Sequence, residues 1–99
     1  MRVDEYTRYD GLGLAELVRG GEVAATELSE IAISAMRPIN EKLNFVVAET
    51  PNATKAGLEQ LHTTSPFAGV PTLVKDVGPT FKGIPQEMAC ELARSFVPT

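Results

Sequence analysis

Lys75 is the first residue in this sequence to consider for chemistry, because it closes an apolar run. It follows residues 66–74, PFAGVPTLV, and precedes Asp76. A lysine buried at the end of a core strand loses hydration, which favours the neutral amine and lets it accept a proton near neutral pH. The alternative is a lysine whose stem lies over the core while its ammonium reaches water. The local pattern alone leaves both interpretations open, and Lys75 is the residue to consider as a base.

The elements that must position Lys75 follow from the apolar pattern. Apolar residues at helical spacing predict helices over residues 12–19, 26–37, 53–62 and 86–96. Short apolar runs predict strands over residues 43–48 and 72–75, and the second of these ends in Lys75. Turns separate the segments, since Pro, Gly, Ser and Thr gather around residues 63–66 and 69–71.

The helix ends carry further signals. Gly20 and Gly21 supply a left-handed stop for the first helix, and Pro38 is expected to end the second. Ala24, at the N-cap of the second helix, offers no side-chain acceptor. The inward faces are expected to carry Leu14, Leu17 and Val18, then Leu28, Ile31, Ala32, Ala35 and Met36, then Ala53, Ala56 and Leu61.

These elements predict an α/β fold that is incomplete in this chain. Two short strands need partners, because their backbone groups otherwise stay unsatisfied. Residues 1–99 are therefore interpreted as one N-terminal fragment of a larger domain, with no complete domain boundary visible.

The ordered motifs resemble the N-terminal portion of the amidase signature family. The similarity includes residues 14–19 (LAELVR), 43–47 (LNFVV), 66–71 (PFAGVP) and 74–76 (VKD), followed by the Gly-x-Pro of residues 83–85. The resemblance runs over roughly residues 10–85 and implies helices packed around a mixed sheet. It also implies a Ser-cis-Ser-Lys apparatus in which Lys75 takes a proton through a bridging serine, because a serine hydroxyl needs a base to become a good nucleophile.

The serine half of this apparatus does not occur in the 99 residues. The family places both serines in a glycine-rich segment downstream of the lysine motif. The serines here are Ser29, Ser34, Ser65 and Ser95, none of them in a glycine-rich turn. The first two are expected on a helix surface, Ser65 in a turn and Ser95 at an exposed position. We therefore expect residues 1–99 alone to be inactive.

Other candidate residues have simpler interpretations. Ala89 and Cys90 replace a small polar pair of the family, and Cys90 has no evident activating partner, so it is expected to be inert. His62 is expected at a helix end on the surface. Asp76 should project away from Lys75 if the strand continues. Residues 11–13, GLG, lack the third glycine of a dinucleotide motif and are interpreted as a loop.

Composition limits the partners. The formal net charge is −4, and no basic patch indicates direct nucleic-acid binding. One cysteine and one histidine exclude an internal disulfide and leave too few ligands for structural zinc. No metal or cofactor is expected. No signal peptide or membrane-length apolar run is visible, so a cytoplasmic protein without membrane partners is predicted.

Three functions follow as hypotheses. The first is amide hydrolysis of a small-molecule substrate by the intact protein, with Lys75 as the base. The second is the amidase subunit of a tRNA-dependent amidotransferase, which would need partner subunits. The third is a truncated, non-catalytic interaction module whose uncovered apolar helix faces favour self-association.

Overall fold

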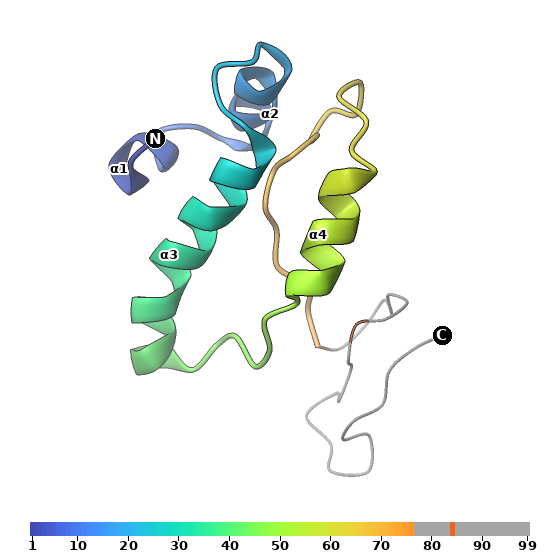
Figure 1. Cartoon of the computed structure of the whole chain (residues 1–99). Helices are drawn as coiled ribbons and strands as arrows, with labels where there is room; N and C mark the ends of the chain where they lie inside the picture. The colour runs from blue at the N-terminus through green and yellow to red at the C-terminus, as the bar shows by residue number, and fades with distance from the viewer. Residues whose placement is uncertain (77–83, 85–99) are drawn as a thin grey trace.

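The structure, a computed structural model, describes residues 1–76 and Ile84. The described part contains four helices, α1 (Val3–Tyr6), α2 (Gly11–Arg19), α3 (Ala25–Leu43) and α4 (Pro51–Glu59) (Figure 1). Two segments without helix or strand, 44–50 and 70–75, follow α3 and the turns after α4. The predictions for Cys90, for Ser95 and for a helix over 86–96 lie outside the described residues.

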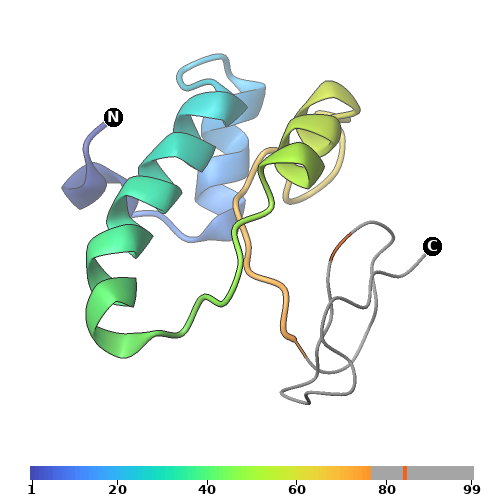
Figure 2. The same cartoon turned by 60° about the horizontal axis from the view of Figure 1, so that its bottom comes forward.

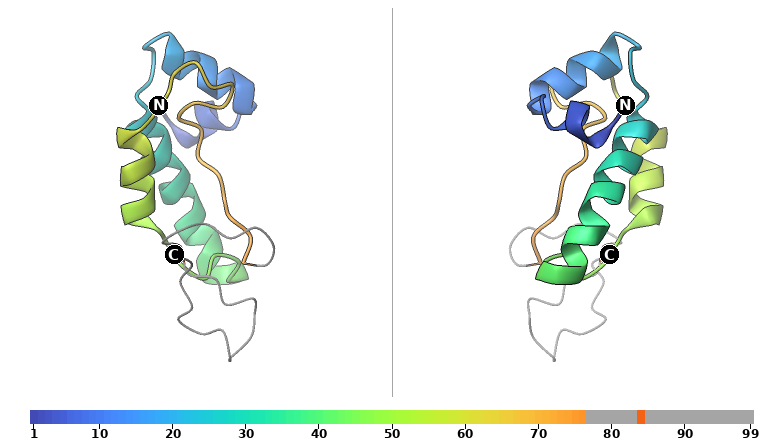
Figure 3. Two further views of the ribbon diagram at one scale, coloured as in Figure 1. Left: turned by 90° about the vertical axis from the view of Figure 1, so that its right-hand side faces the viewer. Right: turned by 90° about the vertical axis from the view of Figure 1, so that its left-hand side faces the viewer.

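Helices α3 and α4 form one layer, and the segment that ends in Lys75 lies against that pair. Helices α3 and α4 lie beside each other in Figures 1 and 2. Residues 70–76 pass between them in Figure 1 and to one side of both in Figure 3, so the segment crosses one face of the helix pair. The short helix α1 packs against α3.

A small core joins α2, the start of α3 and the turn before Lys75. Leu14, Val23 and Leu28 form its centre, and Leu28 is completely buried. Partly buried residues surround this centre: Met1, Tyr6, Leu17, Val18 and Val70. The contact with Val70 ties the PFAGVP motif to the helices, although some forty residues of chain lie between them.

Helix α2 begins and ends with recognisable caps. The Asp10 carboxylate accepts a hydrogen bond from the Gly13 N–H at 2.7 Å, so residues 11–13 form the first helical turn and the prediction of a loop there was wrong. At the other end, Gly21 has φ +75°. The Gly21 N–H donates to the Val18 carbonyl and the Glu22 N–H to the Leu17 carbonyl, which is the predicted left-handed stop.

Helix α3 is longer than predicted. Pro38 lies inside it and the helix continues to Leu43, so the prediction that Pro38 ends it was wrong. Proline removes a single backbone donor, and the residues after it sustain the helix until Asn44, which is left-handed at φ 51° and ψ 43°. The N-cap is Ala24 without a side-chain hydrogen bond, as predicted. The inward face is confirmed, with Leu28 and Ile31 buried.

The two predicted strands are not formed in the described residues. Leu43 is helical, and residues 44–50 and 71–75 have no strand partner there. Strand hydrogen bonds need a neighbour, and the described chain places none beside either segment. The described helices neither confirm nor refute a mixed sheet, so the α/β fold remains a prediction.

Helix α4 carries little of the core. It ends at Glu59, before the predicted end, and Ala56 is exposed instead of buried. Ala53 and Leu61 are half-buried. Across residues 1–76, none of the helices has the length and apolar character needed to cross a bilayer.

Candidate functional site

The PFAGVP motif docks the approach to Lys75 onto α2 and α3. Ala68 is buried, and Gly69 has φ +79°. A Cβ added at Gly69 would lie 2.9 Å from the Ala25 Cβ and 3.3 Å from the Val18 methyl carbons. Only glycine satisfies both the left-handed backbone and this close approach. The motif therefore has a structural role: it fixes where the segment toward Lys75 begins.

A polar contact strengthens the same junction. The Arg19 guanidinium donates a hydrogen bond to the Ser65 carbonyl at 3.1 Å, joining the end of α2 to the turn before the motif. Ser65 is exposed in that turn, as predicted. The Ala68 N–H then donates to the same carbonyl, which closes the turn.

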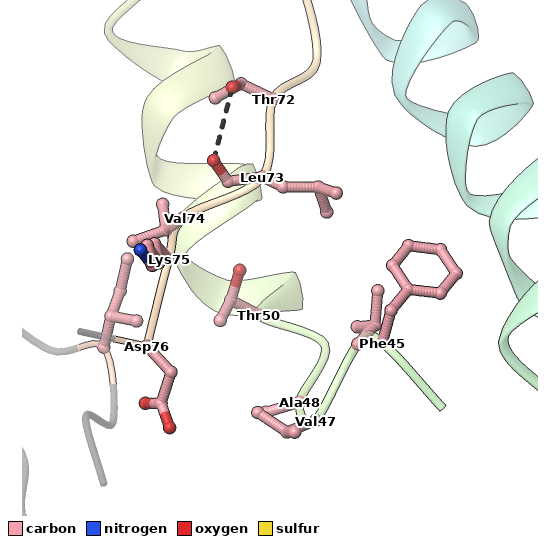
Figure 4. A pocket seen from close by; sticks show the side chains of 11 residues that line it. Phe45, Val47, Ala48, Thr50, Thr72, Leu73, Val74, Lys75 and Asp76 are labelled. Carbon is pink, nitrogen blue, oxygen red and sulfur yellow. Dashed lines mark hydrogen bonds between the residues drawn. The ribbon is translucent and has the colours of Figure 1, made fainter. Parts of the chain in front are cut away.

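Beyond the motif, the chain lines a pocket of about 420 Å³. In Figure 4 its walls come from the two segments predicted as strands, one ending in Lys75 and the other following α3. The wall is mainly apolar and exposed, with Leu73 67% and Val47 72% accessible. Its polar side chains come from Thr50, Thr72, Lys75 and Asp76, and its other residues are Phe45, Val46, Ala48, Val74 and Ile84.

Lys75 lies in this pocket wall but is exposed. The expectation of a buried lysine is thus not met. No element of residues 1–76 covers Leu73 and Val74, the two residues before Lys75. None of the ion pairs within the described residues includes Lys75. Burial favours the neutral amine of a lysine, and the described residues do not bury Lys75.

Asp76 does not pair with Lys75. The two side chains point in different directions in Figure 4, as predicted. No ion pair joins them among the described residues. Asp76 is half-buried and has an interaction of its own.

The other candidate residues lie away from Lys75. Ser34 is exposed on α3, while Ser29 is half-buried and lines a second hollow of about 180 Å³ on α3 and α4. His62 is exposed after α4. Across the described residues, no cluster of three His, Cys, Asp or Glu side chains is placed to hold a metal ion.

The wall opposite Lys75 carries contacts that the sequence analysis did not find. The Arg37 guanidinium holds the Glu49 carboxylate by two hydrogen bonds, of 2.8 and 3.1 Å. This hydrogen bonding, with the attraction between the charges, lowers the pKa of Glu49 and raises that of Arg37. Their separation of twelve residues gives no periodic signal in the sequence.

This chain is similar to a short part of known hydrolases. It is 43% identical over 68 residues to the 6-aminohexanoate-cyclic-dimer hydrolases of Pseudomonas sp. (strain NK87) and Paenarthrobacter ureafaciens, covering 69% of this chain and 13% of each relative. It is 36% identical over 80 residues to the lipoamidase of Enterococcus faecalis, covering 80% of this chain and 11% of that protein. The homologues are amidase-type enzymes.

The match therefore spans only a small share of each relative. No family model matches the chain. No solved structure matches it either. The three relatives are named as hydrolases or amidases and not as amidotransferase subunits. Their names support amide hydrolysis as the activity of the full-length relatives.

Proposed function

We propose that this chain is the N-terminal part of an amidase of the Ser-cis-Ser-Lys type, in which Lys75 is the base. The observation that carries the proposal is the placement of Lys75 in the wall of an apolar pocket, in a chain homologous to amidase-type hydrolases. The relatives are several times longer than the matched region. An intact protein of their length has room for the serine pair and for a cover over the pocket.

The chemistry requires both of these additions. A serine attacks an amide carbonyl only when a base removes its proton, and a lysine serves as that base when it is neutral. An apolar cover over Leu73 and Val74 would remove water from Lys75 and favour the neutral amine. The part of the chain that the structure describes lacks that cover, and the 99 residues lack a serine in a glycine-rich segment, so they supply one component of the site.

The pocket favours amides carried on aliphatic chains. Its wall contains Phe45, Val47, Leu73 and Val74, which present apolar surface beside a lysine and a threonine hydroxyl. Such a surface binds methylene groups through the hydrophobic effect, while the polar groups lie near the amide. The hydrolase and lipoamidase names are consistent with substrates of this class.

The direct experiment assays the full-length gene product. Its intact mass and peptide sequence beyond Thr99 establish whether a glycine-rich serine pair is present. The purified protein is then incubated with 6-aminohexanoate cyclic dimer and with lipoamide, and released amine or ammonia is measured. Hydrolysis of either substrate supports the proposal. A folded full-length protein that hydrolyses neither, and has no serine pair, contradicts it.

The exposed apolar surface favours the interaction module as a second candidate. Large apolar side chains are exposed at the end of α3 and along both pocket walls: Ile39, Leu43, Phe45, Val47, Leu73 and Val74. Exposed apolar surface of this kind is typical of interaction sites. On this account, residues 1–99 would associate with themselves or with a partner without catalysing a reaction.

A further inference from the structure

The last turns of α3 hold the wall of the pocket opposite Lys75 by polar contacts. The Asn40 side-chain amide donates to the Val46 carbonyl at 3.0 Å, and its oxygen accepts from the Val46 N–H at 2.8 Å. One helical turn earlier, Arg37 holds Glu49 with two further hydrogen bonds. Side chains from two successive turns of α3 therefore hydrogen-bond to Val46 and Glu49, which lie three residues apart in the following segment.

The paired contact at Val46 reproduces what a neighbouring strand would provide. In a hydrogen-bonded pair of an antiparallel sheet, one residue exchanges both of its backbone hydrogen bonds with the residue opposite. Here the Asn40 amide supplies the donor and the acceptor. Asn44 makes the contact possible, because its left-handed conformation turns the chain at the end of α3 and its N–H donates to the Asn40 carbonyl at 2.8 Å.

Apolar burial contributes little to holding this wall. Phe45 is 47% accessible and Val47 is 72% accessible, while Val46 between them is only half-buried. Val46 lines both the pocket that contains Lys75 and the smaller hollow against α3 and α4. A shift at Val46 would therefore change the shape of the pocket, and the polar contacts from α3 are what oppose such a shift.

We propose that Asn40 and Arg37 are positioning residues for the amide pocket, and that they keep its wall in place where residues 1–76 provide no strand beside it. The claim rests on the proposed function only for the nature of the ligand. The contacts themselves lie within residues 37–49, so the wall is preformed in this chain.

Amide hydrogen exchange tests the hold on Val46. In the unmodified chain the Val46 N–H should exchange more slowly than amides of exposed segments usually do. Asn40→Ala should speed its exchange about tenfold. Amides of Leu28 and Ile31 should keep their rates. Glu41→Ala is the matched control, because Glu41 is an exposed neighbour of Asn40 on the same helix. Unchanged exchange at Val46 in Asn40→Ala would overturn the proposal.

A second variant covers the case in which Asn40→Ala unfolds the end of α3. Asn40→Asp keeps an oxygen that accepts from the Val46 N–H but loses the N–H₂ donor to the Val46 carbonyl. Protection of the Val46 N–H should persist in this variant. Exchange as fast as in an unstructured peptide, with α3 intact, would contradict the assigned contact.

Binding of hexanamide tests whether the hold matters for the pocket. The probe should shift the methyl resonances of Val47 and Leu73, and Asn40→Ala should weaken its binding at least about threefold while circular dichroism shows the helices still folded. Equal binding to Asn40→Ala and the unmodified chain would overturn the positioning role. Failure of the unmodified chain to bind hexanamide would count against the proposed amide site, while the exchange experiment would still decide the role of Asn40 in holding the wall.

Discussion

Gly69 approaches Ala25 so closely that a Cβ on Gly69 would lie 2.9 Å from the Cβ of Ala25. The two residues are far apart in sequence, and their contact fixes the turn before Lys75 against the start of α3. Gly69 also has φ +79°, a backbone conformation that other residues rarely adopt. The glycine is thus required by shape as well as by conformation.

Replacing this glycine should destabilise the chain. We expect Gly69→Ala to lower the free energy of unfolding by about 1–3 kcal/mol, since the methyl group adds a clash to an unfavourable φ. Gly57→Ala is the control, because Gly57 lies within α4 with open space around it. That variant should raise stability by about 0.5–1 kcal/mol. Urea unfolding followed by circular dichroism measures both, and equal stability of the two variants would refute the close contact.

The cap of α2 gives a second prediction. Asp10→Ala should lower the free energy of unfolding by about 1 kcal/mol, because it removes the carboxylate that accepts from the Gly13 N–H. Asp10→Ser should recover most of the loss, since serine also caps helices. The same urea titration measures both variants. Loss of stability in Asp10→Ser equal to that in Asp10→Ala would show that the cap is not the cause.

The start of α3 gives the opposite prediction. Ala24 is an exposed N-cap in extended conformation without a side-chain acceptor. Ala24→Ser should therefore stabilise the chain by about 0.5–1 kcal/mol. Ala56→Ser, at an exposed position inside α4, is the control and should cost a few tenths of a kcal/mol at most. A destabilised Ala24→Ser would contradict the observed cap geometry.

The Arg37 and Glu49 pair predicts a response to acid. The pKa of Glu49 is lowered in the folded chain, chiefly by its hydrogen bonds to Arg37. A lowered carboxyl pKa stabilises the folded state above the unfolded pKa, and that contribution disappears as pH falls through the folded pKa. The pocket wall should therefore loosen below the ordinary glutamate value of about 4.3. Carboxyl NMR titration should show that Arg37→Gln raises the Glu49 pKa. No change would argue against the pair in solution.

Several features of this chain were predictable from sequence because they depend on local rules. The inward face of α3, the glycine stop after α2 and the uncapped Ala24 each follow from spacing or from one residue type. The end of α3 was missed because a single proline costs one hydrogen bond, which the surrounding helix tolerates. The start of α2 was not predicted because glycines at positions 11 and 13 disfavour a helix, and the Asp10 cap that stabilises this turn is a single side chain.

The site was only partly predictable for a different reason. The motif around Gly69 and Lys75 was visible, and the structure places Lys75 in one pocket wall and Gly69 against Ala25. The burial of Lys75 could not be inferred, because burial depends on what covers residues 73–75 in three dimensions. The role of Asn40 was equally hidden, since a side chain that substitutes for a strand has no sequence pattern of its own.

The central claim is that Lys75 is the base of an amidase, and substitution at Lys75 in the full-length gene product tests it most directly. Lys75→Ala and Lys75→Arg should each lower the rate of amide hydrolysis by about 10²–10⁴-fold, because neither side chain can accept the proton. Circular dichroism spectra should stay unchanged. Lys55→Ala, on the exposed surface of α4, should keep normal turnover. Near-normal hydrolysis by folded Lys75→Ala would contradict the account.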